Sequence, residues 1–284
     1  MTEATSNPCA VCGQYEPDGF ALFHDGRIRL WRCRACGYVS PGIGPGVWRA
    51  PAAISGTGSD AYVEAGEGWR YPHRERVLRD IALRVLRHAG PGGRAVDVGC
   101  GDGQFLAIAR QAGLDPLGIE ADTVLARRAE EQSGCEVIGG RDAIGVLGEL
   151  PAGSAQAVTF IHSLEHFAAP ADVLAAARRQ LAPTGVLAID LPSIRSPHWL
   201  AWRVTGMNRL IDNAWGVIDE HAGYYTPRSL SRLTRGAGLR TLRLTTGRWR
   251  YKHTGAARLA ACVLDPLLNV LRVGGMFYLG TPDG

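Results

Sequence analysis

The segment Ala95-Val96-Asp97-Val98-Gly99-Cys100-Gly101-Asp102-Gly103-Gln104-Phe105-Leu106 determines how this chain is expected to fold. Residues 95–98 form a short apolar run typical of a buried strand, and the alternating glycines after it predict a tight turn. A helix is expected over 104–110, with Gly113 ending it. A strand, a glycine turn and a helix N-terminus together form a nucleotide-binding corner, because glycine lets backbone N–H groups approach a ligand closely.

The spacing of the glycines separates two kinds of nucleotide ligand. A dinucleotide fold requires Gly-x-Gly-x-x-Gly, but Gln104 stands where the third glycine belongs. Asp97 comes just before the turn, where a carboxylate repels pyrophosphate but pairs well with an ammonium group. The favoured ligand is therefore a nucleoside with a cationic amino-acid tail, a description that fits S-adenosylmethionine (SAM).

The run Asp-Val-Gly-Cys-Gly-Asp-Gly at 97–103 resembles motif I of the class I SAM-dependent methyltransferases. This resemblance implies an α/β fold with a seven-stranded, mostly parallel Rossmann-like sheet, helices on both faces, and a last strand, 276–279, inserted antiparallel. It also implies a SAM site at the strand ends. The cofactor-binding residues that it indicates are Asp97, Gly99, Cys100, Gly101, Gly103, Gln104, Phe105, Glu120, Ala121, Asp142, Ala143, His162 and Ser163.

Hydrophobic periodicity places the other elements of this sheet. Helices are expected over 74–88, 122–133 and 172–181, with Asp122 as a helix cap. Thr226 is expected to cap a further helix, with Pro227 at its first position. The expected strands are 116–120, 135–139, 155–161, 185–191 and 239–245.

Two acids follow the second and third strands. Glu120 ends a strand and can accept hydrogen bonds from both ribose hydroxyls, as in dinucleotide folds; otherwise it is a surface acid that begins a loop. Asp142 matches the acid that the family places near the adenine amine, and it can equally cap the short helix that follows.

Two histidines are candidate catalytic residues. His166 belongs to the hexad His162-Ser163-Leu164-Glu165-His166-Phe167, which follows a buried strand and resembles the Leu-Glu-His segment of motif IV. His221 lies in 219–230, which resembles a Glu-His-x-x-x-Phe-Thr-Pro-x-Ser-Leu signature of small-molecule and sugar-linked methyltransferases, with Tyr225 replacing phenylalanine. Either imidazole can act as a general base near neutral pH. We favour His221, while Glu165 and His166 can instead serve only to structure their loop.

Four cysteines near the N-terminus have the spacing of a metal site. Cys9-x-x-Cys12-Gly and Cys33-x-x-Cys36-Gly are separated by 20 residues, which predicts a structural zinc ion with a closed shell of four thiolates. The alternatives are free thiols, or two disulfides, which are disfavoured in a cytoplasm. A hairpin turning at residues 25–26 is expected between the two knuckles.

The predicted domains are a zinc ribbon over 1–40, a linker or lid over 41–72, and a methyltransferase domain over 73–284. Within the last, 196–225 is expected to be an insertion that covers the acceptor side, or else a patch packed on the core or on a dimer partner, so a homodimer stays open. The apolar stretch 256–273 surrounds Asp265-Pro266 and is expected to be a broken core or lid helix rather than an interfacial membrane helix.

Composition restricts the partners. No apolar run reaches the ~20 residues that span a bilayer, and no signal peptide is evident, so we expect a cytoplasmic protein with no membrane span. The net charge is only +4, with Lys252 the single lysine and the arginines scattered, which argues against binding to nucleic acid.

The expected activity is methyl transfer from SAM to a hydroxyl oxygen of a small-molecule or sugar-linked acceptor. The alternatives are a zinc-bearing ribosomal-RNA base methyltransferase and a non-catalytic SAM-binding or zinc scaffold protein.

Overall fold

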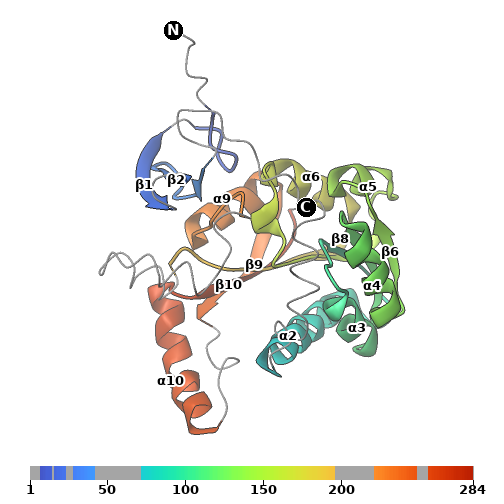
Figure 1. Cartoon of the computed structure of the whole chain (residues 1–284). Coiled ribbons are helices and arrows are strands. Elements are labelled where there is room, and N and C mark those ends of the chain that lie inside the picture. The colour runs from blue at the N-terminus through green and yellow to red at the C-terminus, as the bar shows by residue number, and fades with distance from the viewer. Residues whose placement is uncertain are drawn as a thin grey trace.

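The computed structural model in Figure 1 describes residues 7–14, 16–23, 28–41, 72–195, 221–247 and 255–283. Its main body is a seven-stranded sheet with strand order β6-β5-β4-β7-β8-β10-β9. Strands β4 to β8 pair in parallel, whereas β10 runs antiparallel to both of its neighbours. The predicted fold class, with its antiparallel last strand, is therefore confirmed. The strands are β4 (Arg94–Val98), β5 (Asp115–Glu120), β6 (Glu136–Gly139), β7 (Ala155–Ile161), β8 (Leu181–Leu191), β9 (Leu239–Gly247) and β10 (Gly275–Pro282).

Helices cover both faces of this sheet (Figure 1). The helices of the main body are α2 (Pro72–Ala89), α3 (Gln104–Gln111), α4 (Thr123–Ser133), α5 (Ala143–Glu149), α6 (Pro170–Gln180) and α9 (Pro227–Gly236), with a 3-10 turn, η3 (Leu164–His166). Buried side chains of α2 and α3 pack on one face, and those of α5, α6 and α9 pack on the other. The result is a three-layer α/β domain.

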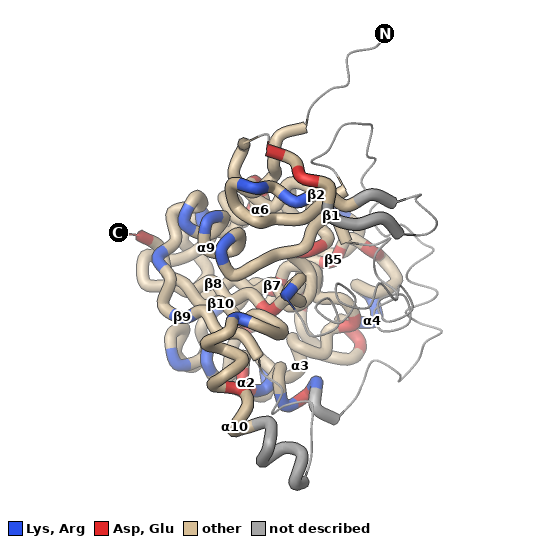
Figure 2. Tube along the Cα trace, turned by 90° about the vertical axis from the view of Figure 1, so that its left-hand side faces the viewer, with Lys and Arg blue, Asp and Glu red and all other residues tan. Residues whose placement is uncertain are grey.

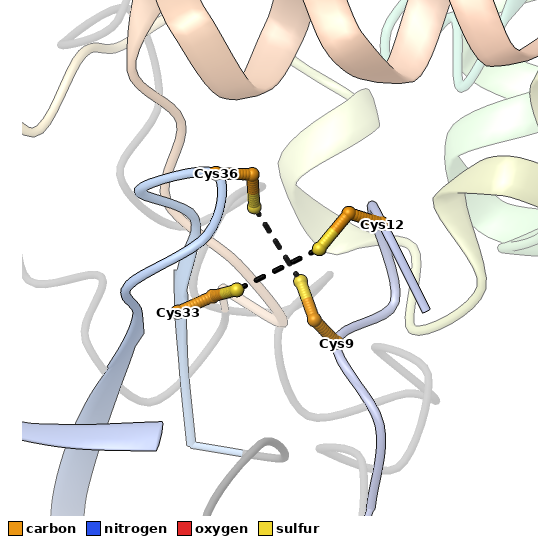
Figure 3. A group of neighbouring side chains, drawn as sticks. All are labelled: Cys9, Cys12, Cys33 and Cys36. Carbon is orange, nitrogen blue, oxygen red and sulfur yellow. Dashed lines mark hydrogen bonds between the residues drawn. The ribbon is translucent and has the colours of Figure 1, made fainter. Parts of the chain in front are cut away.

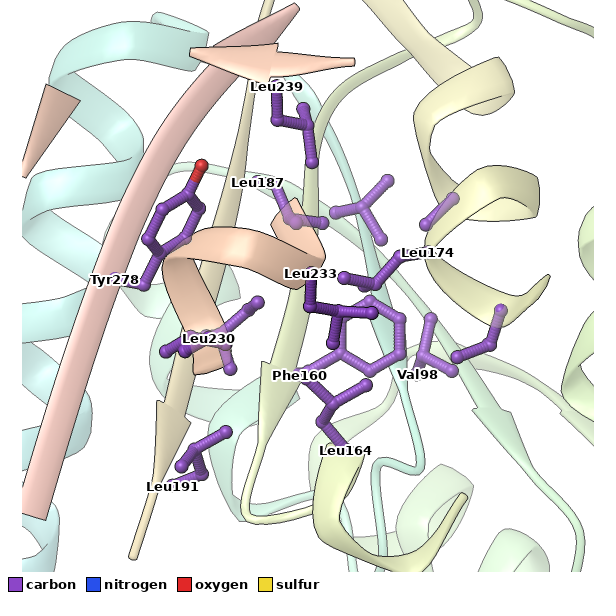
Figure 4. Close-up of a cluster of buried hydrophobic side chains, with 14 of the residues drawn as sticks. Val98, Phe160, Leu164, Leu174, Leu187, Leu191, Leu230, Leu233, Leu239 and Tyr278 are labelled. Atoms are coloured by element: carbon purple, nitrogen blue, oxygen red, sulfur yellow. The ribbon is translucent and has the colours of Figure 1, made fainter. Parts of the chain in front are cut away.

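The two-residue period of β7 explains how one strand serves both layers. Val158 and Phe160 pack in the cluster formed with α5, α6 and α9, while Ala157 and Ile161 pack against α2 and α3. Figure 4 shows Phe160 at the centre of the first cluster, between helices α6 and α9 and the sheet. Because both faces of the strand are covered, its sequence is apolar almost throughout.

Two helices begin where the sequence predicts that they should. The Asp122 side chain accepts hydrogen bonds from the backbone N–H groups of Val124 and Leu125, at 2.8 and 3.0 Å. Thr226 and Ser229 form a capping box at the start of α9, with Pro227 in its first turn. Both caps are confirmed, and both are local features that need no tertiary contact.

The N-terminal residues form a separate three-stranded antiparallel sheet. Its strands are β1 (Pro17–Phe23), β2 (Ile28–Cys33) and β3 (Val39–Ser40). Pairing of β1 with β2 confirms the predicted hairpin, although its turn at 25–26 lies outside the described residues. The predicted linker or lid over 41–72 and the predicted insertion over 196–225 also fall mostly outside them.

The apolar stretch near the C-terminus differs from expectation. It forms a continuous helix, α10 (Gly255–Leu271), that passes through Pro266. Several of its apolar side chains are exposed, including Val263 and Val270, each 77% exposed. The helix is therefore neither broken nor a core helix. Hydropathy alone does not tell whether a neighbouring element covers a helix. The alternative that it is a lid stays a prediction. Among the described helices, none is long and apolar enough to cross a membrane.

The arginines are not all scattered. Figure 2 shows basic and acidic positions intermixed along much of the chain, but basic positions gather on α9 and β9. These two elements pack against each other. Their exposed arginines are Arg228, Arg232, Arg235, Arg240 and Arg243.

The packing of the central layer makes a prediction about stability. Leu187 of β8 is fully buried, so Leu187→Ala should lower the free energy of unfolding by about 2–5 kcal/mol, through lost burial and a cavity. Leu242→Ala on β9 is the matched control, because Leu242 is 39% exposed and should cost at most about 0.5 kcal/mol. Urea unfolding followed by circular dichroism measures both. Equal losses would contradict the assigned faces.

Candidate functional site

The glycine turn after β4 needs its glycines for two physical reasons. Gly99, Gly101 and Gly103 all have positive φ angles, of 72°, 57° and 78°, a region that side chains with a Cβ rarely adopt. Space is also short, since a Cβ on Gly99 would lie 2.7 Å from the Cβ of Ser163, and one on Gly103 would lie 2.8 Å from the backbone of Ala129. The turn therefore packs directly against two neighbouring segments.

Asp97 lines a small pocket next to this turn, together with Arg74, Gly99, Gln104 and Phe105. The carboxyl group is buried, and it accepts a hydrogen bond of 2.6 Å from the Thr159 hydroxyl. Burial raises the pKa of Asp97 to about 7, with a smaller contribution from the nearby Glu120 charge. A cationic group in the pocket would restore the ionised form.

Glu120 holds two turns together. One of its oxygens accepts a hydrogen bond from the backbone N–H of Gly101 at 2.8 Å, and the other from the N–H of Asp122 at 3.0 Å. Burial raises the pKa of this carboxyl group, against those two hydrogen bonds. The side chain is therefore part of the glycine turn, rather than a loose surface acid. Ala121 follows it on the exposed bend that leads into α4.

Asp142 caps α5, the second of the two roles that the sequence leaves open. Its side chain accepts a hydrogen bond of 2.7 Å from the backbone N–H of Gly145. Asp142 is exposed at the carboxyl end of β6, and Ala143 is half-buried beside it. Its proposed contact with adenine stays a prediction.

A hydrogen bond joins the residues that follow β7 to the end of β4. The buried Ser163 hydroxyl donates a hydrogen bond of 2.6 Å to the backbone carbonyl of Val98. His162 has a positive φ of 54°, and its backbone N–H donates to the carbonyl of Asp190 at 2.7 Å. The ring of His162 lies 3.6 Å from carboxylate oxygens of both Glu165 and Asp190. Burial lowers the pKa of His162, but the two carboxylates outweigh it and the pKa is raised.

The structure brings both candidate catalytic histidines together. The imidazole centroids of His166 and His221 lie 4.9 Å apart in an edge-on arrangement. Glu165 lies beside them, and one ligand atom from each of the three residues falls within 4.8 Å of the others. We call these three residues the Glu165–His166–His221 cluster. Glu165 follows Ser163 by two positions, so the cluster lies at the same sheet edge as the glycine turn.

Two members of the cluster are almost completely buried, Glu165 at 2% and His221 at 6% exposure. Burial alone would raise the pKa of Glu165, but His162, His166 and His221 lower it to about 2. Burial lowers the pKa of His221 to about 4, even though the charge of Glu165 opposes that shift. At neutral pH the cluster therefore holds a carboxylate beside a neutral imidazole with a free electron pair.

The N-terminal module holds the segment that carries His221. The backbones of Val39 and Tyr224 exchange two hydrogen bonds, at 3.0 and 2.7 Å, and the Ser40 hydroxyl donates to the carbonyl of Ala222 at 2.8 Å. The Tyr38 ring covers Gly223 so closely that any Cβ there would overlap it. The sequence does not reveal this contact.

The four predicted metal-binding cysteines meet at one point (Figure 3). The Sγ atoms of Cys9 and Cys36 are 3.6 Å apart, as are those of Cys12 and Cys33. A disulfide requires about 2.05 Å, whereas two ligands of a tetrahedral zinc with bonds of about 2.3 Å lie about 3.8 Å apart. No disulfide joins these four cysteines, and their arrangement fits a zinc ion.

Sequence reasoning missed four residues that line the pocket, Arg74, Leu78, Asp102 and Ile161. It also missed Thr159, the hydrogen-bond partner of Asp97, and the signal for Thr159 is a single hydroxyl in the otherwise apolar end of β7. Arg74 lines the pocket from α2, and no local pattern distinguishes it from the other arginines of that helix.

Comparisons with known proteins agree with this geometry. A family model described as a methyltransferase domain matches residues 70–244. A ubiquinone biosynthesis O-methyltransferase from Methylococcus capsulatus is 32% identical over 159 residues, which cover 55% of this chain and 67% of that protein. Its namesake from Hahella chejuensis is 31% identical over 156 residues, covering 54% of this chain and 65% of that protein. The matches thus span about two thirds of these relatives.

Among solved structures, a SAM-dependent methyltransferase from Archaeoglobus fulgidus shares the fold. It aligns with a TM-score of 0.56 at 16% identity, over 78% of this chain and 99% of that one. The family match over more than half of the chain agrees with the strand order and with the glycine turn. The chain belongs to the class I SAM-dependent methyltransferases.

Proposed function

We propose that this enzyme transfers the methyl group of SAM to a hydroxyl oxygen of a small-molecule or sugar-linked acceptor. The observation that carries the proposal is the position of the Glu165–His166–His221 cluster at the same sheet edge as the glycine turn, where a proton acceptor is useful. Hydroxyl chemistry is further supported by the curated relatives, which are named as O-methyltransferases.

The residues around the pocket fit the cofactor. Asp97 is buried with a raised pKa and would pair with the ammonium of the amino-acid tail. Glu120 would accept hydrogen bonds from the ribose hydroxyls while it keeps the glycine turn in place. Asp142, at the end of the next strand, would contact the adenine. When bound, SAM supplies an intrinsically activated methyl group, so the chain mainly has to align the acceptor and exclude water.

On the acceptor side, the cluster would supply the group that accepts the proton of the hydroxyl. His221 is neutral at pH 7 because burial depresses its pKa, and its imidazole can therefore accept a hydrogen bond or a proton from an acceptor hydroxyl. Glu165 stabilises positive charge on either neighbouring imidazole. His166 lies on the more open side of the cluster and would orient the hydroxyl.

The proposed domain arrangement gives the four cysteines a purpose. Residues 1–40 would form a zinc ribbon, with the ion held by Cys9, Cys12, Cys33 and Cys36, and 73–284 would form the catalytic domain. Four thiolates close the coordination shell, so the ion would stabilise the module rather than take part in chemistry. The module would then support His221 through β3.

The raised pKa of Asp97 predicts a pH dependence of cofactor binding. Pairing with an ammonium requires the carboxylate, which is lost as the pH falls through about 7. Affinity for S-adenosylhomocysteine should therefore fall about tenfold between pH 8 and pH 6. Calorimetric titration measures it. Asp97→Asn should bind weakly with little pH dependence, and unchanged affinity in that variant would remove Asp97 from the site.

The role of His221 can be tested by replacing it. His221→Ala should lower kcat by about 10²–10⁴-fold, the usual contribution of a positioned proton acceptor, with S-adenosylhomocysteine binding retained. His88→Ala is the matched control, since His88 is exposed at the end of α2. Transfer of label from methyl-labelled SAM to a panel of phenolic and sugar-linked hydroxyl compounds supplies the rate.

Three outcomes of that assay would contradict the proposal. Full turnover in His221→Ala would return His221 to a structural role. Label entering RNA in place of small molecules would favour the nucleic-acid alternative. Cofactor binding without turnover on any acceptor would favour a non-catalytic scaffold.

The zinc assignment predicts a specific loss of metal. Cys12→Ser should lower the zinc content by one ion per chain and reduce the thermal midpoint, because the shell of four thiolates is then incomplete. Cys262→Ser is the control, since Cys262 is exposed on α10. Elemental analysis and thermal unfolding measure both changes. Unchanged zinc content in Cys12→Ser would show that the thiols do not hold the ion.

A further inference from the structure

We propose that Glu165, His166 and His221 form a second metal site that binds a divalent transition-metal ion. The ion would place the acceptor hydroxyl and make it more acidic. Metal binding itself is independent of the proposed function, whereas the effect on the acceptor rests on it.

Unsatisfied buried atoms point to a missing ligand. Oε2 of Glu165 and Nδ1 of His221 are both buried and have no hydrogen-bond partner among the described residues. Each belongs to a side chain that is more than nine-tenths buried. Leaving a buried carboxylate oxygen and a buried ring nitrogen without partners costs free energy that a bound cation would remove.

The geometry of the cluster fits an ion after a small adjustment. One ligand atom from each residue lies within 4.8 Å of the other two. Ligands at about 2.0–2.2 Å from a tetrahedral ion lie about 3.4 Å from one another. Closing the remaining gap requires rotations of the imidazoles, and the His166 side chain is only half-buried.

The donor set indicates the class of ion. Two imidazoles and one carboxylate, with positions left open, are the ligands of catalytic zinc sites and of other first-row dications. Magnesium and calcium prefer oxygen ligands. This site therefore differs from the four-cysteine cluster near the N-terminus, whose thiolates leave no open position.

The surrounding residues hold the ligands as outer-shell groups do in metal sites. The other oxygen of Glu165, Oε1, faces His162 at 3.6 Å, and His162 faces Asp190 at 3.6 Å. The backbone carbonyl of Glu165 accepts a hydrogen bond of 3.1 Å from the N–H of Gly223, two residues after His221. Glu165 can thus keep one oxygen for His162 and offer the other to the ion.

An open position on this ion would take the acceptor hydroxyl. The O–H bond then breaks more easily, because the cation stabilises the oxygen that keeps the electron pair, and the proton leaves to water. In this arrangement His221 would be a metal ligand rather than the proton acceptor, and the ion would promote loss of the proton. The loss of turnover expected in His221→Ala stays the same.

The test uses the full-length protein with its zinc retained and CoCl₂ as the probe. Calorimetry counts the added ions, and visible absorption identifies their ligands. Nitrogen and oxygen ligands give ligand-field bands alone, whereas exchange into the four-cysteine cluster adds thiolate charge-transfer absorption. We expect one added Co²⁺ per chain without the thiolate bands. No added ion, or Co²⁺ found only with the thiolate bands, would overturn the proposal.

Variants locate the site. His221→Ala and Glu165→Gln should lose the added Co²⁺, while the exposed control His88→Ala should keep it. Retained S-adenosylhomocysteine binding shows that a variant is folded, and the wild-type titration decides the proposal even if a variant is not. Retention of Co²⁺ in both folded variants would overturn the assignment. Co²⁺ binding without methyl transfer would contradict only the proposed function, and methyl transfer without Co²⁺ binding would contradict only this inference.

Discussion

The close contact between Gly99 and Ser163 joins the two halves of this site. Gly99 follows β4, Ser163 follows β7, and the Ser163 hydroxyl donates to the carbonyl of Val98 at 2.6 Å. A Cβ on Gly99 would come within 2.7 Å of Ser163 and push the two loops apart. Because β4 and β7 are parallel neighbours, their carboxyl ends meet at one edge. The pocket at Asp97 and the Glu165–His166–His221 cluster are neighbours for this reason.

Two buried carboxyl groups at that edge have pKa values that are shifted in opposite directions. Asp97 has the hydroxyl of Thr159 as its partner and the like charge of Glu120 nearby, so burial dominates and its pKa rises to about 7. Glu165 is equally buried, but three imidazoles surround it, and its pKa falls to about 2. Groups whose environments push their pKa values apart are typical of sites that divide tasks. Asp97 lines a pocket that an organic cation can enter, whereas Glu165 stays ionised and faces imidazoles.

Local patterns in the sequence predict most of the sheet and the helix caps, because those features depend on neighbouring residues. The strand 155–161 is found at its predicted bounds, and Asp122 and Thr226 cap the helices as expected. Sequence patterns do not predict contacts between residues that are far apart in the chain. Ser40 bonds to Ala222 across 182 positions, and no local pattern encodes that pair. The exposure of α10 is missed for the same reason, because an apolar helix has the same sequence pattern whether covered or bare.

The same long-range pair joins the N-terminal module to the segment that carries His221. Holding His221 in place costs conformational entropy, which contacts of its own segment have to offset. Strand β3 offers Tyr224 two backbone hydrogen bonds, and Tyr38 covers Gly223. The four cysteine side chains of this module converge on one point. The segment that carries His221 is therefore held by residues about 180 positions away in the sequence, next to that point of convergence rather than next to the glycine turn.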